Sequence, residues 1–203
     1  MFITLRARSC DFGRCEQMGT RVIVPRMHLH VTPPLDGRTF GEDQLCFACG
    51  PHHPHGFRMV FDAREGNWNK AEPAEWVEST FVPRELDQGA PGVMHGGLVT
   101  TIADEVGAWA LVVLLGKFGF TISMACKFRN PVRVGVPAVA RARVLRDSTR
   151  IMTVEVRILQ TLEGEERICF TGTLDFIWMD ETMAERTLGQ PLRDEWKRFC
   201  KKT

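Results

Sequence analysis

The feature that most constrains this chain is an apolar run from Leu98 to Leu115, which begins directly after a His-Gly-Gly turn. Apolar residues cover almost the whole helical circumference, so the run predicts one long helix that is buried on nearly all sides. Its length approaches that of a membrane span, but the adjacent acids Asp104 and Glu105 lie near its centre and argue against insertion. We therefore expect a soluble chain, without a membrane partner, built around this helix.

The start of this helix and one of its acids indicate chemistry. Gly96 and Gly97 leave the first N–H groups of the helix uncovered, which lets a ligand oxygen approach closely, as in an oxyanion hole. Asp104 follows seven residues after Gly97, on nearly the same face and ~10 Å further along the axis. A carboxylate buried in an apolar helix costs several kcal/mol unless it is paired, so we expect the protein to use Asp104.

The rest of the sequence is typical of strands. Short strands are expected at 56–63 and 74–82, with a polar turn between them, and period-two alternation predicts strands near 120–129, 136–145, 152–158 and 168–178. Residues 84–92 form a loop that leads to the helix, and Gly116 and Gly119 close its other end. The fold class is α+β, with about six mostly antiparallel strands around one long helix.

Composition limits the remaining possibilities. The 203 residues are 44% hydrophobic and 25% charged, which suits one domain, and a net charge of +1 gives no pull toward nucleic acid. The seven cysteines are an odd number in a chain without a convincing signal peptide, so we expect a cytoplasmic protein without structural disulfides. We expect an N-terminal extension at 1–45, the folded domain at 46–180, and a C-terminal peripheral helix or tail at 181–203.

Three sequence blocks resemble one family. The string Gly92–Gly97, with an acid nine positions after its histidine, is similar to the hot-dog-fold acyl-CoA thioesterases of the PaaI-like (phenylacetate-degradation) branch. The Cys-x-x-Cys-Gly block from Cys46 to Phe57 and the aromatic-x-x-Pro-Val-x-x-Gly block from Phe128 to Gly135 agree with it. The resemblance spans roughly residues 45–179 and implies a hot-dog fold, in which the sheet wraps around the central helix.

The resemblance also implies a reaction, the hydrolysis of an acyl-CoA thioester. Gly96 and Gly97 would form the oxyanion hole, and Asp104 would act as base or nucleophile, with Glu105 as the alternative. His95 would either orient the carbonyl or cap the turn. The separation along the helix means that the acid must come from a partner subunit, so we expect a homodimer or homotetramer. No cofactor is needed, because coenzyme A is part of the substrate.

Further residues are assigned to substrate binding through the resemblance. Related enzymes place an Asn or Gln upstream of the His-Gly-Gly turn, where this chain has Gly89 with Gln88 beside it. Thr121 stands where they place a hydroxyl near the acid. Arg129 and Arg133 are candidates for the phosphates of coenzyme A.

The Cys46-x-x-Cys49 pair raises the question of a metal. Thiolates together with the nearby imidazoles of His52, His53 and His55 can in principle close a tetrahedral zinc site. Only one such cysteine pair is present, however, and we assign no metal from the sequence.

Two other functions remain open. A hot-dog hydratase or dehydratase would carry a catalytic Asp and His together, whereas this helix has an acid with no histidine after it. A non-catalytic acyl-CoA or acyl-ligand binding protein would have little use for a buried Asp104. A thiol-release assay on a panel of acyl-CoAs separates the three functions.

Overall fold

A computed structural model of the chain describes residues 35–64 and 76–201. The first 34 residues, including Cys10 and Cys15, and the polar turn expected at 65–73 lie outside the described residues. The described elements, in chain order, are η1 (Gly37–Phe40), β1 (Asp62–Arg64), β2 (Trp76–Phe81), η2 (Glu85–Asp87), β3 (Gln88–Ala90), β4 (Val93–Met94), α1 (Gly96–Ala110), η3 (Leu111–Leu115), β5 (Gly119–Phe128), β6 (Ala138–Asp147), β7 (Ile151–Leu162), β8 (Glu165–Trp178), α2 (Glu181–Leu188) and α3 (Asp194–Lys197).

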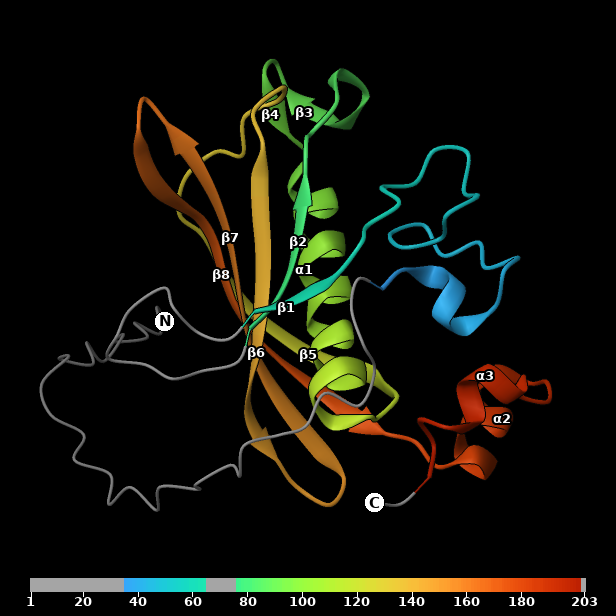
Figure 1. Cartoon of the computed structure of the whole chain (residues 1–203). Helices are drawn as coiled ribbons and strands as arrows, with labels where there is room; N and C mark the ends of the chain where they lie inside the picture. Colours follow the sequence, from blue (N-terminus) through green and yellow to red (C-terminus); the bar gives the residue numbers. More distant parts are fainter. Residues whose placement is uncertain (1–34, 65–75, 202–203) are drawn as a thin grey trace, which may run out of the picture.

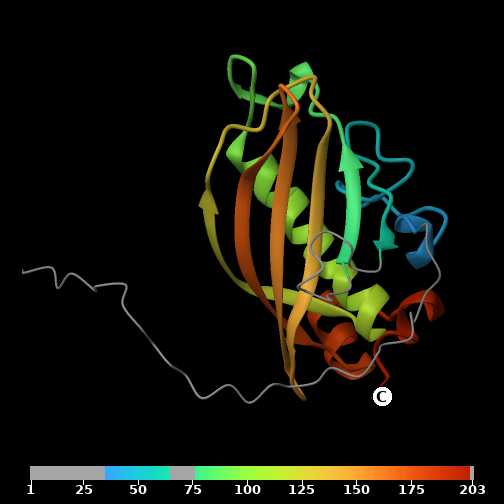
Figure 2. The same cartoon turned by 60° about the vertical axis from the view of Figure 1, so that its left-hand side comes forward.

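One antiparallel sheet organises the fold. Its six strands run in the order β1-β2-β6-β7-β8-β5, and it curls around α1, which lies along its concave face (Figures 1 and 2). The long hairpin β7–β8 forms the middle of the sheet, in register from Ile151 opposite Ile177 to Leu162 opposite Glu165. The predicted α+β class, with six strands around one long helix, is confirmed.

The first expected strand is mostly absent. β1 covers only Asp62–Arg64, while the segment before it pairs with the turn at 46–50: the Phe57 and Met59 N–H groups donate to the carbonyls of Phe47 and Ala48, at 3.0 and 2.9 Å. Arg58 between them has a φ of 52°, a left-handed conformation that interrupts an extended chain. The second candidate is found as β2, and its first residues, 74–75, lie outside the described part of the chain.

Strand β5 shows where alternation misleads. The pattern predicts that Ile122 and Phe128 face the core, yet they are 53% and 57% exposed. β5 is the edge strand of the sheet, and its pairing with β8 shifts register between Thr121 and Ser123, which leaves Ile122 without a partner at the bulge. Phe128 does lie on the core side, opposite Phe170 with ring centroids 5.4 Å apart, but it stands at the free edge of the sheet and stays exposed. Cys126, which we expected in the core, is half-buried and packs against it.

The central helix is as predicted at both ends. It begins at Gly96, and after Ala110 it continues through one π-helical segment, η3, to Gly116, whose φ of 62° ends it. Gly119 opens β5 rather than closing the helix. By length and composition the Gly96–Leu115 helix could cross a membrane, but 67% of its most apolar window is buried inside the structure, as in a core helix.

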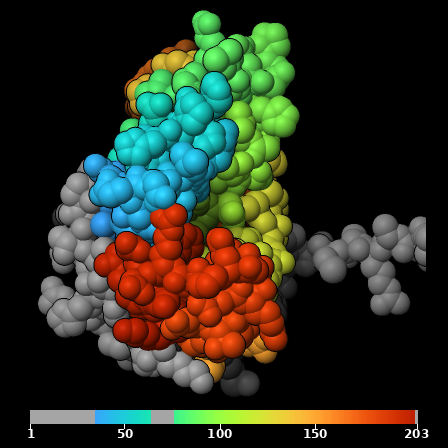
Figure 3. Space-filling model, turned by 90° about the vertical axis from the view of Figure 1, so that its right-hand side faces the viewer, coloured from blue at the N-terminus to red at the C-terminus, as the bar shows by residue number. Residues whose placement is uncertain are grey.

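The face of the helix that points away from the sheet is covered by the two ends of the described chain. Phe61 stacks on Trp109 with ring centroids 4.5 Å apart, and Phe40 packs edge-on to the same indole at 5.4 Å. Trp196 stacks on Phe40 and donates its Nε1 proton to the Phe40 carbonyl at 3.0 Å. Figure 3 shows the resulting surface, with the segment that starts at Leu35 directly beside the C-terminal helices. The described part of the N-terminal extension therefore contributes to the core.

Candidate active site at the start of the central helix

The helix start presents one free amide. The Nδ1 atom of His95 accepts a hydrogen bond from the Gly97 N–H at 3.0 Å, so the side chain caps the helix. The Leu98 and Val99 N–H groups donate to the His95 carbonyl at 2.9 and 3.1 Å. Within residues 35–64 and 76–201, this leaves the Gly96 N–H without an acceptor. That amide stands at the positive end of the helix dipole and is available to a ligand oxygen.

A cavity of about 380 Å³ opens beside this amide. It is lined by Val93, Met94, Gly96, Val99 and the segment from Phe128 to Val132. Arg129 is part of this lining, which places a cation at the mouth of the cavity. Arg133 is not; its backbone N–H donates to the Gln160 side chain at 2.7 Å, and its own side chain is exposed.

Asp104 lies further along the helix and is half-buried, whereas the apolar run had predicted that it would be deeply buried. Its Oδ1 atom accepts a hydrogen bond of 2.5 Å from the hydroxyl of Thr121 on β5. Thr121 is exposed, so this pair lies at the border between the helix and the free edge of the sheet. Asp104 and Thr121 are therefore in contact, as the sequence predicted.

Glu105 is half-buried like Asp104, but its carboxylate is enclosed by other groups. Its Oε1 atom accepts a hydrogen bond from the indole Nε1 of Trp109 at 2.9 Å, and its Oε2 atom lies 3.5 Å from the Cys46 sulfur. Burial, together with the nearby Cys46, raises the pKa of Glu105 to about 7. Since its carboxylate is engaged by Trp109 and Cys46, Glu105 does not share the surroundings of Asp104.

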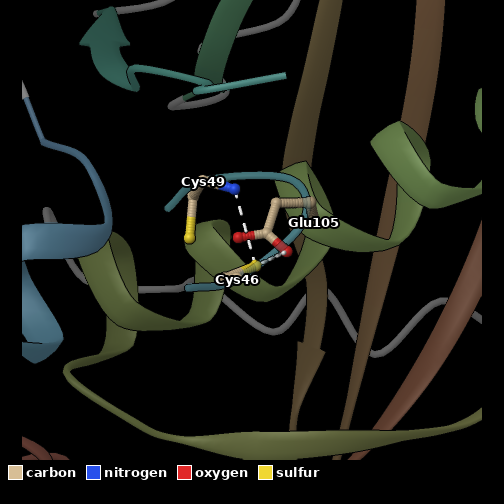
Figure 4. Close-up of side chains that lie close together, drawn as sticks. All are labelled: Cys46, Cys49 and Glu105. Carbon is tan, nitrogen blue, oxygen red and sulfur yellow. Dashed lines mark hydrogen bonds between the residues drawn. The ribbon is translucent and has the colours of Figure 1, made fainter. Parts of the chain in front are cut away.

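Cys46 and Cys49 face Glu105 (Figure 4). One ligand atom from each of the three residues lies within 4.8 Å of the others. The hydrogen bond with Cys49 is the main reason why the pKa of Cys46 falls to about 5, and the same contact together with burial raises the pKa of Cys49. The sequence could not indicate Glu105 as a neighbour, because 59 residues separate it from Cys46.

The three histidines that sequence analysis grouped with these cysteines are not part of the cluster: His52, His53 and His55 contribute no ligand atom to it. The Nδ1 atom of His53 instead accepts a hydrogen bond from the His55 backbone N–H at 3.2 Å.

The loop before the helix explains the positions of Gln88 and Gly89. The Gln88 side chain donates to the Glu85 carbonyl at 2.8 Å and accepts from the Gly92 N–H at 2.6 Å, so it braces the loop. A Cβ atom at Gly89 would lie only 3.1 Å from the His95 Cα, so the glycine allows the loop to lie flat against the capping histidine. Neither residue offers a free amide side chain to a ligand.

An ion pair between the exposed Arg84 and the buried Asp87, which the sequence did not reveal, fixes this loop. The Arg84 side chain donates to both carboxylate oxygens of Asp87, at 2.8 and 3.1 Å, and the Asp87 carbonyl accepts the His95 N–H at 2.8 Å. Burial alone would raise the pKa of Asp87, but the hydrogen bonds from Arg84 outweigh it and hold the pKa below the ordinary value of 3.8. The pair therefore positions the residue that caps the central helix.

The six-stranded sheet curled around one long helix is the hot-dog fold. A family model described as thioesterase superfamily matches residues 91–165 of this chain. This segment contains the His-Gly-Gly turn, α1 and Thr121.

Three known proteins resemble this chain in sequence or in fold. A Saccharolobus solfataricus protein provisionally named an esterase is 26% identical over 99 residues, which span 48% of this chain and 63% of that relative. An acyl-CoA hydrolase from Staphylococcus aureus, solved with butyryl coenzyme A and coenzyme A, has a TM-score of 0.50 and 21% identity, covering 53% of this chain and 68% of that one. A further thioesterase superfamily protein has a TM-score of 0.54 and 19% identity, covering 71% and 69%. At these identities the structures show the fold alone.

Proposed function

We propose that this protein is an acyl-CoA thioesterase, which hydrolyses an acyl-CoA to a free acid and coenzyme A in the cytoplasm. The observation that carries the proposal is that Gly96, the residue at the helix start whose neighbour Gly97 is bonded to His95, lines a cavity that Arg129 also lines. A thioester carbonyl held there would gain its developing negative charge next to a fixed donor and the helix dipole. Arg129 would meet a phosphate of coenzyme A.

Asp104 is the proposed base or nucleophile, and it would act on the site of a second copy. Gly96 and Asp104 are ~12 Å apart along the helix axis, because each residue rises ~1.5 Å. The acid therefore does not reach a carbonyl at its own helix start. A half-buried stripe of the helix that includes Thr101, Asp104 and Ala108 adjoins the free edge of β5, and this surface suits a homodimer, or a tetramer of such dimers.

The proposed hydrolysis needs a base, a water molecule and one oxyanion donor. If Asp104 acts as the base, a water O–H bond breaks, its proton passes to the carboxylate, and the hydroxide oxygen bonds to the thioester carbon. The carbonyl oxygen takes the negative charge opposite Gly96. When the carbonyl re-forms, the C–S bond breaks, and the coenzyme A thiolate leaves and takes the proton back. Thr121 would hold the Asp104 carboxylate in position for the first step.

The Staphylococcus aureus hydrolase gives further support. Structures of that enzyme carry alanine in place of an asparagine, an aspartate or a threonine. Its aspartate and threonine are separated by 17 positions, as Asp104 and Thr121 are here. Counted back from the aspartate by the same number of positions, the asparagine would correspond to Gly89 in this chain. We propose that this chain keeps the acid–hydroxyl pair and works without the upstream amide, and that its Cys46–Phe57 block places it in the PaaI-like branch.

The test is a thiol-release assay on short, long and aromatic acyl-CoAs. We expect turnover by the wild type and a fall in kcat of at least ~10²-fold for Asp104→Asn, because the amide keeps the shape but removes the base. Asp147→Asn, which breaks the ion pair with Lys117, is the control and should keep full activity. Full activity of Asp104→Asn would refute the assigned role, and tight acyl-CoA binding without turnover by the wild type would identify a binding protein.

A further inference from the structure

The backbone of the turn that carries Cys46 and Cys49 is held in one tight conformation. The Gly50 N–H donates to the Cys46 carbonyl at 2.8 Å, and the Cys49 N–H points at the Cys46 sulfur at 3.5 Å. A Cβ atom on Gly50 would lie 2.5 Å from the Cys46 carbonyl oxygen, so only glycine allows the chain to close this tightly. The turn therefore holds two sulfur atoms on the side that faces helix α1 (Figure 4).

The third group, Glu105, comes from α1 at a distance suited to a shared cation. Its Oε2 atom is 3.5 Å from the Cys46 sulfur. Zinc bonds of about 2.3 Å to sulfur and about 2.1 Å to oxygen, set at the tetrahedral angle, separate the two ligands by about 3.6 Å. The observed distance fits this value. The Cys49 sulfur lies within 4.8 Å of the other two ligand atoms, so a small movement would bring it to bonding distance from the same zinc ion.

Within the described part of the chain, no ion pair includes Glu105. Its hydrogen-bond donors are the neutral indole of Trp109 and the Cys46 sulfur. Glu105 is half-buried, and Cys49 beside it is only 3% exposed. A carboxylate partly withdrawn from water next to thiols is costly without a positive charge, and a divalent cation would supply it. Trp109 would then orient the ligand from outside, as donors around metal sites commonly do.

We propose that Cys46, Cys49 and Glu105 bind one zinc ion, which fastens the 46–50 turn to the central helix. Two thiolates favour zinc over magnesium or calcium, which prefer oxygen ligands. Three protein ligands leave the fourth position for water. The proposal is independent of the thioesterase assignment, because its site lies apart from the Gly96 cavity and its test measures metal content.

The experiment starts with the full chain, purified under reducing conditions from zinc-supplemented cells. We expect about one zinc per chain by elemental analysis, and zinc affinity, measured against a competing chelator, that is more than ~100-fold weaker in Cys46→Ser and Cys49→Ser. Trp109→Phe should weaken zinc binding by ~10–100-fold, as is usual for a donor outside the ligand shell. Cys126→Ser, a half-buried cysteine on β5, is the matched control and should bind zinc normally.

Cobalt provides a readout that does not depend on how well the variants fold. The wild-type chain loaded with Co²⁺ should show the intense bands of a tetrahedral site together with a thiolate-to-cobalt charge-transfer band. A reduced wild-type chain that retains no zinc, a Co²⁺ spectrum without thiolate charge transfer, or a stable Cys46–Cys49 disulfide in the purified protein would each overturn the proposal.

Discussion

The proposed role of the Gly96 amide can be tested by removing one hydrogen. Gly96→Pro deletes the N–H at the first position of the helix, where proline is well tolerated. The preceding residue is already suited to proline, since His95 has a ψ of 132° in the extended region. Gly96→Ala is the matched control, because it keeps the N–H and its Cβ atom would meet the Phe128 ring at an ordinary 3.5 Å. Both variants should therefore fold.

The expected difference in kcat between the two variants follows from the number of N–H donors that remain at the helix start. The Gly97 N–H is already bonded to His95, so Gly96 is the amide left for an oxyanion. Removing one such donor costs about 10²–10³-fold in kcat, which corresponds to about 2.7–4 kcal/mol. The assay is acyl-CoA thiol release, with thermal unfolding to show that both variants are intact. If kcat of the proline variant stays within about three-fold of the alanine variant, equal to less than ~1 kcal/mol, the amide is not the oxyanion donor.

Three further predictions concern the acid, the assembly and the loop. Thr121→Val should lower kcat by about 10- to 100-fold in the same assay, since a hydrogen bond to a charged group contributes about 1.5–3 kcal/mol; unchanged kinetics would remove Thr121 from the site. Subunits with Asp104→Asn, dead on their own, should regain about a quarter of the wild-type sites when randomly mixed with Gly96→Pro subunits, and none if each site lies within one chain. Asp87→Asn should lower the free energy of unfolding by about 1.5 kcal/mol at neutral pH. Because the folded pKa of Asp87 is depressed, denaturant titrations should show this difference undiminished above pH 3.8 and lost as the pH falls through the lowered pKa; a difference independent of pH would contradict the role of the ion pair.

The sequence could predict those helix ends and strands that depend only on residues close together in the chain. The helix start depends on the His-Gly-Gly turn itself, and its end depends on Gly116, so both were visible in the residues alone. The strands β6, β7 and β8 follow from period-two alternation, because each has one face against the helix and one face outside. Strand β5 broke the rule, since an edge strand with a bulge does not have one buried face.

Features that depend on distant contacts were not predictable. The segment at 56–61 has the composition of a strand, but its Phe57 and Met59 N–H groups donate to the turn at 46–50, and its Phe61 N–H donates to the Leu35 carbonyl. Phe40 and Phe61 cover part of the apolar helix from within the chain, through contacts with Trp109. No local sequence pattern predicts either of these two contacts. The argument for a dimer therefore depends on the separation of Gly96 from Asp104 and not on uncovered apolar surface.

The two adjacent acids show that a shift of one position along a helix is enough to place a side chain in different surroundings. Neighbouring side chains on a helix point ~100° apart, so Asp104 and Glu105 must enter different surroundings. The sequence indicates only that an apolar helix contains two acids; the neighbours of each acid depend on how the helix is turned against the sheet. In the structure both acids are half-buried, but Asp104 turns toward Thr121 at the sheet edge, while Glu105 turns toward Cys46. A carboxylate at the sheet edge suits proton transfer at a shared site, and a carboxylate beside two thiols suits a cation, so one pair of residues supports two separate chemical roles.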